Sequence, residues 1–230
     1  DSLWQKGVSA YTAGDWNGSV EAWDALASTG VVSPELYYNL GNAYFKSGDY
    51  ADAILYFERT LKADPSYSDA RFNLEFANGL IQDKIDEVPE FVLKNWARRL
   101  GYHLDSGAWA ALSLVFLALA LALAVLFFRG VTAGVKRTGF YAGIAALVLA
   151  VSSFGLSVWQ RNSYLKDDYA IIMAPVSSVK SSPSAESSKD LFVLHEGTKV
   201  KILDSVGSWK NISLSDGRQG WAKESDLEII

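Results

Sequence analysis

The sequence predicts a multidomain membrane protein with three parts: an all-α helical repeat, a two-helix transmembrane hairpin and an all-β barrel. Three observations support this architecture. Equivalent side chains recur every 34 residues in the N-terminal part of the chain. Two uncharged stretches, Ser106–Phe128 and Thr138–Gln160, are each long enough to cross a bilayer as a helix. After Gln160, short β-branched runs alternate with Gly, Ser and Asp, which is typical of small barrels.

The helical repeat is assigned to residues 1–85. Trp4, Tyr38 and Phe72 share one column of the 34-residue period, and Gly7 and Gly41 share another. The middle unit shows the most complete pattern of aromatic, small and Pro positions: Tyr37, Leu40, Gly41, Tyr44, Ala53, Phe57 and Pro65. This pattern resembles the tetratricopeptide repeat family, which implies pairs of antiparallel helices stacked side by side.

Two full units and one helix need a further element at their far end, because each unit buries one face on a neighbour. Ile81–Leu100 is the candidate, since its apolar residues recur at helical spacing and Pro89 lies near a helix start. We expect an amphipathic capping and juxtamembrane helix, assigned to residues 86–105. It would dock partly on the last repeat and partly in the lipid headgroup layer.

The two uncharged stretches predict transmembrane helices at residues 106–128 and 138–160. At about 1.5 Å per residue, such a helix spans roughly 34 Å, against a hydrocarbon core of about 30 Å. Small residues favour close helix packing, so we expect Gly139 and Gly143 to face Ala118 and Ala122. The alternative use of this glycine face is dimerisation.

The connector, residues 129–137, fixes the predicted orientation. It carries Arg129, Lys136 and Arg137 and no acidic residue, and short basic loops stay in the cytoplasm. The opposing evidence is a basic group before the first span: Lys94, Arg98 and Arg99. We therefore expect a two-pass membrane protein whose N- and C-terminal domains both face outward, away from the cytoplasm. The chain has no Cys, which excludes disulfides and thiolate metal sites.

Tetratricopeptide stacks bind partner segments in the groove lined by their first helices, so the resemblance implies a partner-binding surface. The residues predicted to line it are Trp4, Tyr38, Asn42, Phe45, Phe72 and Phe76. The alternative is that these aromatic columns are packing between repeats. Residues 1–85 hold 12 acidic and 6 basic residues, which argues against nucleic-acid binding and favours a protein partner.

The C-terminal segment, residues 168–230, predicts about five short strands. Lys199–Leu203 and Trp209–Ser213 alternate with period two, and Asp216–Gly217 is a hairpin turn. The order of these motifs, with Gly220–Trp221 after the turn, resembles the bacterial SH3 domain. Trp209 and Trp221 are expected in the core or at its rim.

No motif in the sequence predicts catalysis. The two histidines, His103 and His195, are separated by the predicted hairpin and are expected at the membrane edge and on the surface. No nucleophile elbow, phosphate loop or metal-ligand spacing accompanies them. The sequence therefore predicts a protein that is not an enzyme, with no catalytic residue, no cofactor and no metal site.

The order of the three parts is itself informative. Together with Asn39–Lys46, Asp69–Glu75 and Asp83–Phe91, it resembles the BatE-type family of aerotolerance-operon membrane proteins. The resemblance implies a two-pass protein of the bacterial inner membrane whose N- and C-terminal domains are periplasmic. It also implies a complex with other envelope proteins, namely Bat-operon proteins with von Willebrand A domains and further tetratricopeptide repeats, and a role in aerotolerance or stress resistance. The rival hypothesis is a peptidoglycan-binding anchor in which the barrel holds the cell wall and the repeats recruit an envelope enzyme.

Overall fold

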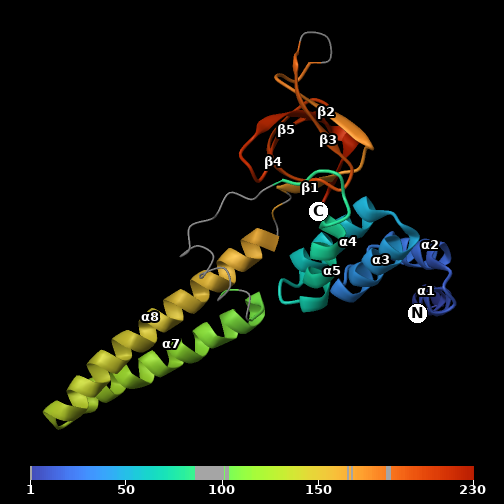
Figure 1. Ribbon diagram of the computed structural model, residues 1–230. Coiled ribbons are helices and arrows are strands. Elements are labelled where there is room, and N and C mark those ends of the chain that lie inside the picture. Colours follow the sequence, from blue (N-terminus) through green and yellow to red (C-terminus); the bar gives the residue numbers. More distant parts are fainter. Residues whose placement is uncertain (1, 86–100, 102–103, 165, 167, 185–187) are drawn as a thin grey trace. The chain divides into compact units, whose positions relative to one another are not determined.

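The computed structural model describes residues 2–85, 101, 104–164, 166, 168–184 and 188–230 (Figure 1). The chain divides into two compact units, one formed by Asp1–Pro89 with Asp167–Ile230 and the other by Glu90–Lys166. The first unit contains the helical repeat and a C-terminal sheet, and the second contains two long helices. Most of the predicted juxtamembrane helix, residues 86–105, lies outside the described residues.

Five helices build the repeat: α1 (Ser2–Thr12), α2 (Trp16–Ala27), α3 (Pro34–Ser47), α4 (Tyr50–Ala63) and α5 (Ser68–Asn78). The ends of α3 follow directly from its sequence. The Ser33 side chain accepts a hydrogen bond from the Leu36 amide, and Pro34 occupies the first turn, where its missing N–H costs nothing. Gly48, with φ of 96°, ends the helix in the left-handed conformation that glycine adopts without strain.

The same helix crossing occurs twice, 34 residues apart. A Cβ atom added to Gly41 would lie 2.6 Å from the Phe57 ring, and one added to Gly7 would lie 2.3 Å from the Trp23 ring. Each glycine on a first helix therefore makes room for an aromatic ring on the second. Trp23 and Phe57 are fully buried, so the periodic columns of the sequence correspond to repeated packing.

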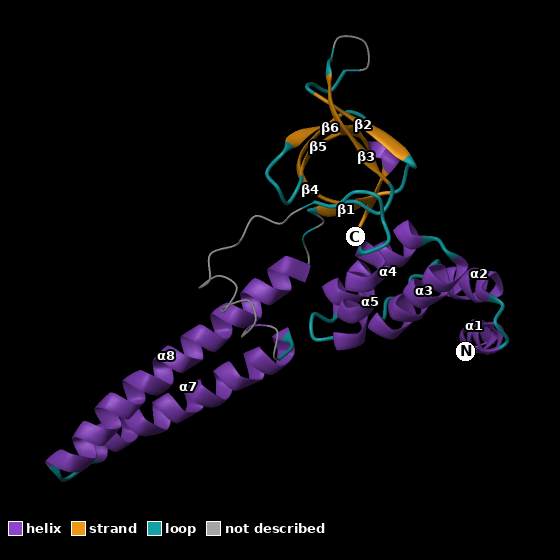
Figure 2. Cartoon of the chain, viewed as in Figure 1, coloured by secondary structure: helices purple, strands orange, loops and turns teal. Residues whose placement is uncertain are grey.

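The C-terminal sheet has seven antiparallel strands: β1 (Tyr169–Ile172), β2 (Val176–Lys180), β3 (Asp190–His195), β4 (Lys199–Val206), β5 (Trp209–Ser213), β6 (Gln219–Lys223) and β7 (Leu227–Ile229). Their order is β3-β2-β6-β5-β4-β1-β7, and the sheet curls around its own core (Figure 2). The core side chains include Ile172, Val179, Leu194, Val200 and Ile212. The sequence predicted about five strands, and its alternation corresponds to β4 and β5 among the seven.

The repeat and the C-terminal sheet share one hydrophobic core. Ile54 and Leu55 of α4 and Leu74 of α5 cluster with Ile171 of β1 and with Ile230. The sheet thus covers the far end of the stack, the role predicted for a helix beginning at Ile81. Residues 81–85 are not helical, and this part of the prediction is wrong. Ile81 packs against the shared core and Ile85 against the core of the sheet.

Polar contacts close the same junction. The Asp83 carboxylate accepts hydrogen bonds from the His195 amide (2.7 Å), His195 Nδ1 (2.8 Å) and Thr198 Oγ1 (2.8 Å). Burial alone would raise the pKa of Asp83, but these donors hold it below its usual value. Two ion pairs add to the contact, Arg59–Glu228 (2.8 Å) and Lys199–Glu58 (2.7 Å). His195, expected as a surface residue, is partly buried here.

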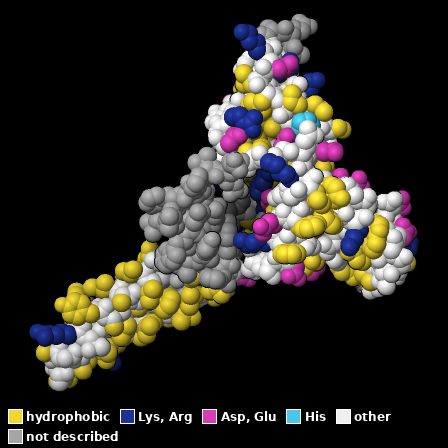
Figure 3. Space-filling view, in the orientation of Figure 1, with side chains coloured by type: hydrophobic (Ala, Val, Ile, Leu, Met, Phe, Trp, Pro, Cys, Tyr) yellow, Lys and Arg dark blue, Asp and Glu magenta, His cyan; other side chains and the backbone are white. Residues whose placement is uncertain are grey.

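The second unit is a hairpin of α7 (Ser106–Arg129) and α8 (Ala133–Tyr164). Both helices are long and apolar enough to cross a membrane. Only 11% and 17% of their most apolar windows are buried, so most of their apolar side chains face outward (Figure 3). The predicted connector, residues 129–137, is shorter than expected, because Arg129 ends α7 and α8 begins at Ala133.

Most buried residues of the seam between α7 and α8 are small on both helices, with Ser113 and Ala120 on α7. Gly139, Ala146, Ala150 and Ser153 are buried on α8 and recur at intervals of three, four or seven residues. A Cβ added to Gly139 would lie 2.9 Å from the backbone of Leu123 and Phe127.

The predicted partners of these glycines are wrong. Ala118 and Ala122 are exposed, and Gly139 and Gly143 face Ala120, Leu123 and Phe127 instead. Because α7 is apolar on every side, its sequence has no amphipathic pattern that identifies the packed face.

Candidate functional site

The candidate site is the surface that α3 and α5 present together. Asn73 of α5 lies at its centre and donates through Nδ2 to Asn42 Oδ1 (2.8 Å) and to the Tyr38 hydroxyl (3.3 Å). The rings of Phe45 and Phe76 lie 5.7 Å apart. Four of the predicted groove residues, Tyr38, Asn42, Phe45 and Phe76, are therefore brought together.

The most exposed members of the set are on α5. The side chain of Phe72 is 71% exposed and that of Phe76 is 58% exposed, although both are large aromatic residues. They are one helical turn apart, so they share a face of α5. Burying such a ring contributes about 1.5–3 kcal/mol of favourable free energy. A second surface that covered this face of α5 would gain that contribution.

Trp4, the remaining predicted residue, lies apart from this set. Its ring is 6.1 Å from that of Trp23, and it packs against the cluster of Trp23, Leu36 and Leu40. This contact corresponds to the packing alternative for its column. Tyr38 shows both uses, since its ring packs 6.1 Å from Phe57 while its hydroxyl reaches Asn73.

Two residues of the surface were not predicted. Asn73 orients Tyr38 and Asn42, and Tyr67 places its ring 4.9 Å from that of Tyr38. Asn73 follows Phe72 directly, so it falls outside the columns of the 34-residue period that carry aromatic residues. The signal in the sequence that could have identified Asn73 is an amide residue on α5, the helix that contacts the helix of Asn42.

The chemistry of the surface is apolar with an amide centre. Aromatic faces and amide groups suit the apolar side chains and the backbone of a peptide segment. In the described part of the chain, no group of three or more His, Cys, Asp or Glu side chains could hold a metal ion. The arrangement is a partly exposed aromatic surface with a hydrogen-bonded amide pair at its centre.

The comparison with protein families matches the segment that contains α3 and α4. The model of the tetratricopeptide repeat matches residues 34–67. Residues 34–67 form a tetratricopeptide repeat. No curated protein matches the chain. The repeat supplies the α3 half of the groove, and α5 follows as the first helix of the next unit.

Two other predicted features lie in the C-terminal sheet. Trp209 is 8% exposed and Trp221 is half-buried, which agrees with the prediction that both lie in the core or at its rim. Gly220 precedes Trp221 in β6, and a Cβ at this position would lie 2.5 Å from Val179. Glycine is therefore required where β2 and β6 approach each other.

Proposed function

We propose that the protein is a membrane-anchored adaptor of a bacterial envelope complex, which holds a partner protein in the groove between α3 and α5. The observation that carries this proposal is the exposure of Phe72 and Phe76 beside the Asn42–Asn73 pair, next to a tetratricopeptide repeat. Repeats of this kind recognise protein segments, and exposed aromatic pairs are frequent anchors in interfaces. The role is non-catalytic.

The anchor is the α7–α8 hairpin. Its outward-facing side chains are apolar along both helices, which a soluble protein would bury. Because the repeat and the C-terminal sheet share a core, they must lie on the same side of a membrane, and two spans return the chain to that side. The basic turn, with Arg129, Lys136 and Arg137, favours a cytoplasmic tip and a periplasmic repeat–sheet unit.

The resemblance to BatE-type proteins supports a narrower form of this proposal. The partners would be Bat-operon proteins with von Willebrand A domains or further tetratricopeptide repeats, and the complex would serve aerotolerance or stress resistance. The C-terminal sheet would be a bacterial SH3 domain. If this sheet instead binds peptidoglycan, the purified protein will sediment with murein sacculi, and the adaptor will be a cell-wall anchor.

The groove is tested by the double substitution Phe72→Ala and Phe76→Ala. Both rings are exposed, so the fold should persist, while loss of two anchors should weaken partner binding by about 2 kcal/mol or more, roughly 30-fold. Crosslinking in native membranes followed by mass spectrometry measures the loss. Val31→Ala with Val32→Ala is the matched control, because these residues are exposed on the α2–α3 loop. Equal crosslinking by both double variants would exclude the groove.

Orientation is tested with single cysteines, because the chain has none. Ser66→Cys and Ser215→Cys are exposed sites in the repeat and the sheet, and Thr132→Cys lies in the α7–α8 turn. A membrane-impermeant maleimide applied to spheroplasts should label the first two and spare the third. Labelling at Thr132→Cys alone would invert the proposed orientation.

A further inference from the structure

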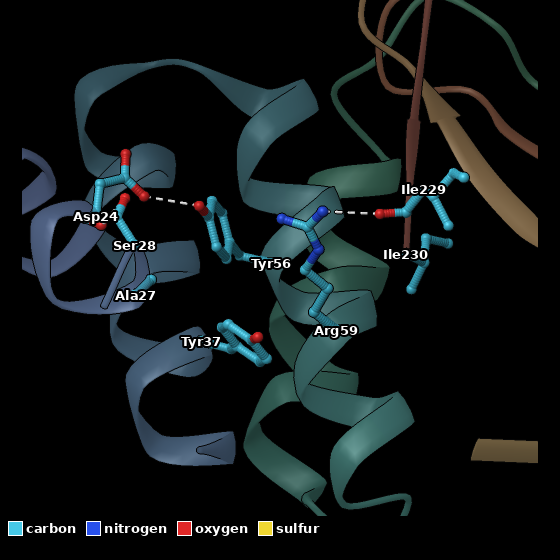
Figure 4. A pocket seen from close by; sticks show the side chains of 8 residues that line it. All are labelled: Asp24, Ala27, Ser28, Tyr37, Tyr56, Arg59, Ile229 and Ile230. Atoms are coloured by element: carbon cyan, nitrogen blue, oxygen red, sulfur yellow. Dashed lines mark hydrogen bonds between the residues drawn. The ribbon is translucent and has the colours of Figure 1, made fainter. Parts of the chain in front are cut away.

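A cleft of about 570 Å³ lies away from the groove, between the second helices of the repeat units and the end of the chain (Figure 4). None of the groove residues lines it. Its walls come from α2, α3, α4 and β7: Asp24, Ala27, Ser28, Tyr37, Tyr56, Arg59, Ile229 and Ile230. The volume is within the range of ligand sites, about 300–1,000 Å³.

Asp24 supplies the fixed charge of the cleft. Its carboxylate accepts hydrogen bonds from the hydroxyls of Tyr44 (2.5 Å) and Tyr56 (2.6 Å), one on each oxygen. Burial and the bond to Asp24 raise the pKa of both tyrosines, so both hydroxyls remain donors. Within the described residues, no Lys, Arg or His nitrogen pairs with Asp24.

Arg59, the cation that lines the cleft, is already engaged. Its Nη2 donates to Glu228 Oε1 (2.8 Å) and to the Ile229 carbonyl (2.7 Å), so its charge is offset by Glu228. The surroundings of Asp24 are therefore acidic. The pKa of Asp52 on α4 shows the effect of these surroundings, since it is raised to about 6. Burial is the largest cause, the charges of Asp49, Asp24 and Glu228 add to it, and Arg59 opposes it.

The remaining walls are aromatic and aliphatic. The Tyr37 and Tyr56 rings lie 5.9 Å apart, and Figure 4 shows the Tyr37 ring beside the cleft. Arg59 already lies over the Tyr56 ring at 5.4 Å, a cation–π arrangement. Ala27 and Ile229 offer apolar surface of the kind that covers the methylene stem of a long cationic side chain, whereas Ile230 is buried in the shared core.

We propose that this cleft binds an Arg or Lys side chain of a partner protein, with the cationic group at Asp24 and the stem between Tyr37 and Ile229. Charge complementarity identifies the occupant. A carboxylate that two tyrosine hydroxyls hold in place beside aromatic faces, with no cationic partner in the described part of the chain, favours a guanidinium or ammonium group. Ile229 and Ile230 belong to the C-terminal end of the sheet segment, so the site is complete only while the sheet packs on the repeat. The proposal concerns a surface separate from the groove.

The test uses the full chain in lipid nanodiscs and three peptides of the form acetyl-Gly-Leu-X-Leu-Gly-amide, where X is Arg, Lys or citrulline. Citrulline is the neutral isostere of Arg. Ligand-observed saturation-transfer NMR measures the dissociation constants. We expect the Arg and Lys peptides to bind at least fivefold more tightly than the citrulline peptide. Equal binding of all three peptides would overturn the proposal.

Two variants locate the effect. Asp24→Asn keeps the size of the side chain and should remove the preference for Arg over citrulline. Ala27→Arg places a tethered guanidinium at the cleft wall and should block the Arg peptide even if Asp24→Asn fails to fold. Asp49→Asn is the control, since it removes a nearby negative charge that does not line the cleft and should keep the preference. A preference that survives both Asp24→Asn and Ala27→Arg would place the binding elsewhere.

The groove variant separates this proposal from the adaptor function. Phe72→Ala with Phe76→Ala should keep the Arg preference, because neither residue lines the cleft. Loss of the preference in that variant would show that the peptides bind the groove. Competition with free spermidine, a polycation, is a further check. If spermidine weakens the binding of the Arg and citrulline peptides equally, its effect is charge screening, and that result would contradict a side-chain site.

Discussion

Helices α4 and α8 place their apolar residues in opposite ways. In α4, the large apolar residues Ile54, Leu55 and Phe57 are buried, and its charged residues are half-buried. In α8, the buried residues are small, such as Ala146 and Ala150, while Leu147, Val148 and Leu149 are 48%, 58% and 48% exposed. The proposed membrane anchor accounts for this difference. Burial drives the packing of α4 in water, whereas close backbone approach would pack α8 in lipid, a medium as apolar as its own surface.

The largest effect is expected in the repeat core. Phe57→Ala should lower the free energy of unfolding by about 3–5 kcal/mol, because it removes a fully buried ring and leaves a cavity beside Gly41. Denaturant titration followed by the helical circular-dichroism signal measures this change. Val32→Ala, which truncates an exposed side chain, should change it by less than about 1 kcal/mol. Equal effects would mean that the core is elsewhere.

The second prediction tests whether the exposed face of α8 meets lipid. Leu147 lies near the middle of the segment Ala133–Asn162. Leu147→Lys should cost about 2.5–3.5 kcal/mol of insertion free energy if this face meets lipid. Carbonate extraction of membranes measures the inserted fraction, and Leu147→Ala is the size control. If α8 instead faces water, the lysine will leave the protein's behaviour unchanged or improve its solubility.

The sequence predicts those contacts whose residues recur at a regular spacing and misses those without a local pattern. The crossings of Gly7 with Trp23 and Gly41 with Phe57 repeat at a fixed spacing, so the period identifies them. Side-chain alternation likewise identifies β4 and β5. The α7 face could not be predicted, because Ala118 and Ala120 differ only in position on a helix that is apolar on every side.

The groove is predicted in part for the same reason. Tyr38, Asn42 and Phe76 follow from the first-helix positions of the repeat, whereas Asn73 depends on how α5 turns against α3. The junction between repeat and sheet was missed altogether. Its contacts, such as Asp83–His195, join residues 112 positions apart, and no local period carries such a pairing. Residues 81–85 carry apolar residues at helical spacing but are not helical, and Ile81 and Ile85 pack against the two cores instead.

The third prediction concerns the polar contacts that close the repeat–sheet unit. Asp83→Asn removes a charge that accepts three hydrogen bonds and should lower stability by about 1–2 kcal/mol. Because the folded-state pKa of Asp83 is lowered, its contribution is present above the ordinary Asp value, about pH 4, and is lost as the pH falls through the folded pKa. Thermal unfolding at pH 7 measures the loss. Glu58→Gln, which affects the more exposed Lys199 pair, should cost less than about 1 kcal/mol.

The smallest effect is expected from Asp52, on the polar face of α4. Its pKa is raised to about 6, with burial as the first cause, so its ionisation opposes folding. The penalty is fully present above pH 6 and disappears as the pH falls toward the ordinary Asp value near 4, where the unfolded chain also takes up the proton. Asp52 is only half-buried, and solvent screening reduces the penalty to about 1 kcal/mol.

Asp52→Asn should therefore stabilise the protein at pH 8 and have little effect at pH 4.5. A gain of about 1 kcal/mol corresponds to roughly 2–4 °C in the unfolding temperature of a unit of this size. Glu21→Gln, an exposed acid on α2, is the control and should give no pH-dependent difference. If both variants behave alike, the acidic surroundings of α4 do not act on Asp52. The outer face of α4, like that of α8, would then carry no unfavourable charge interaction. The two helices would differ only in the side chains that they bury.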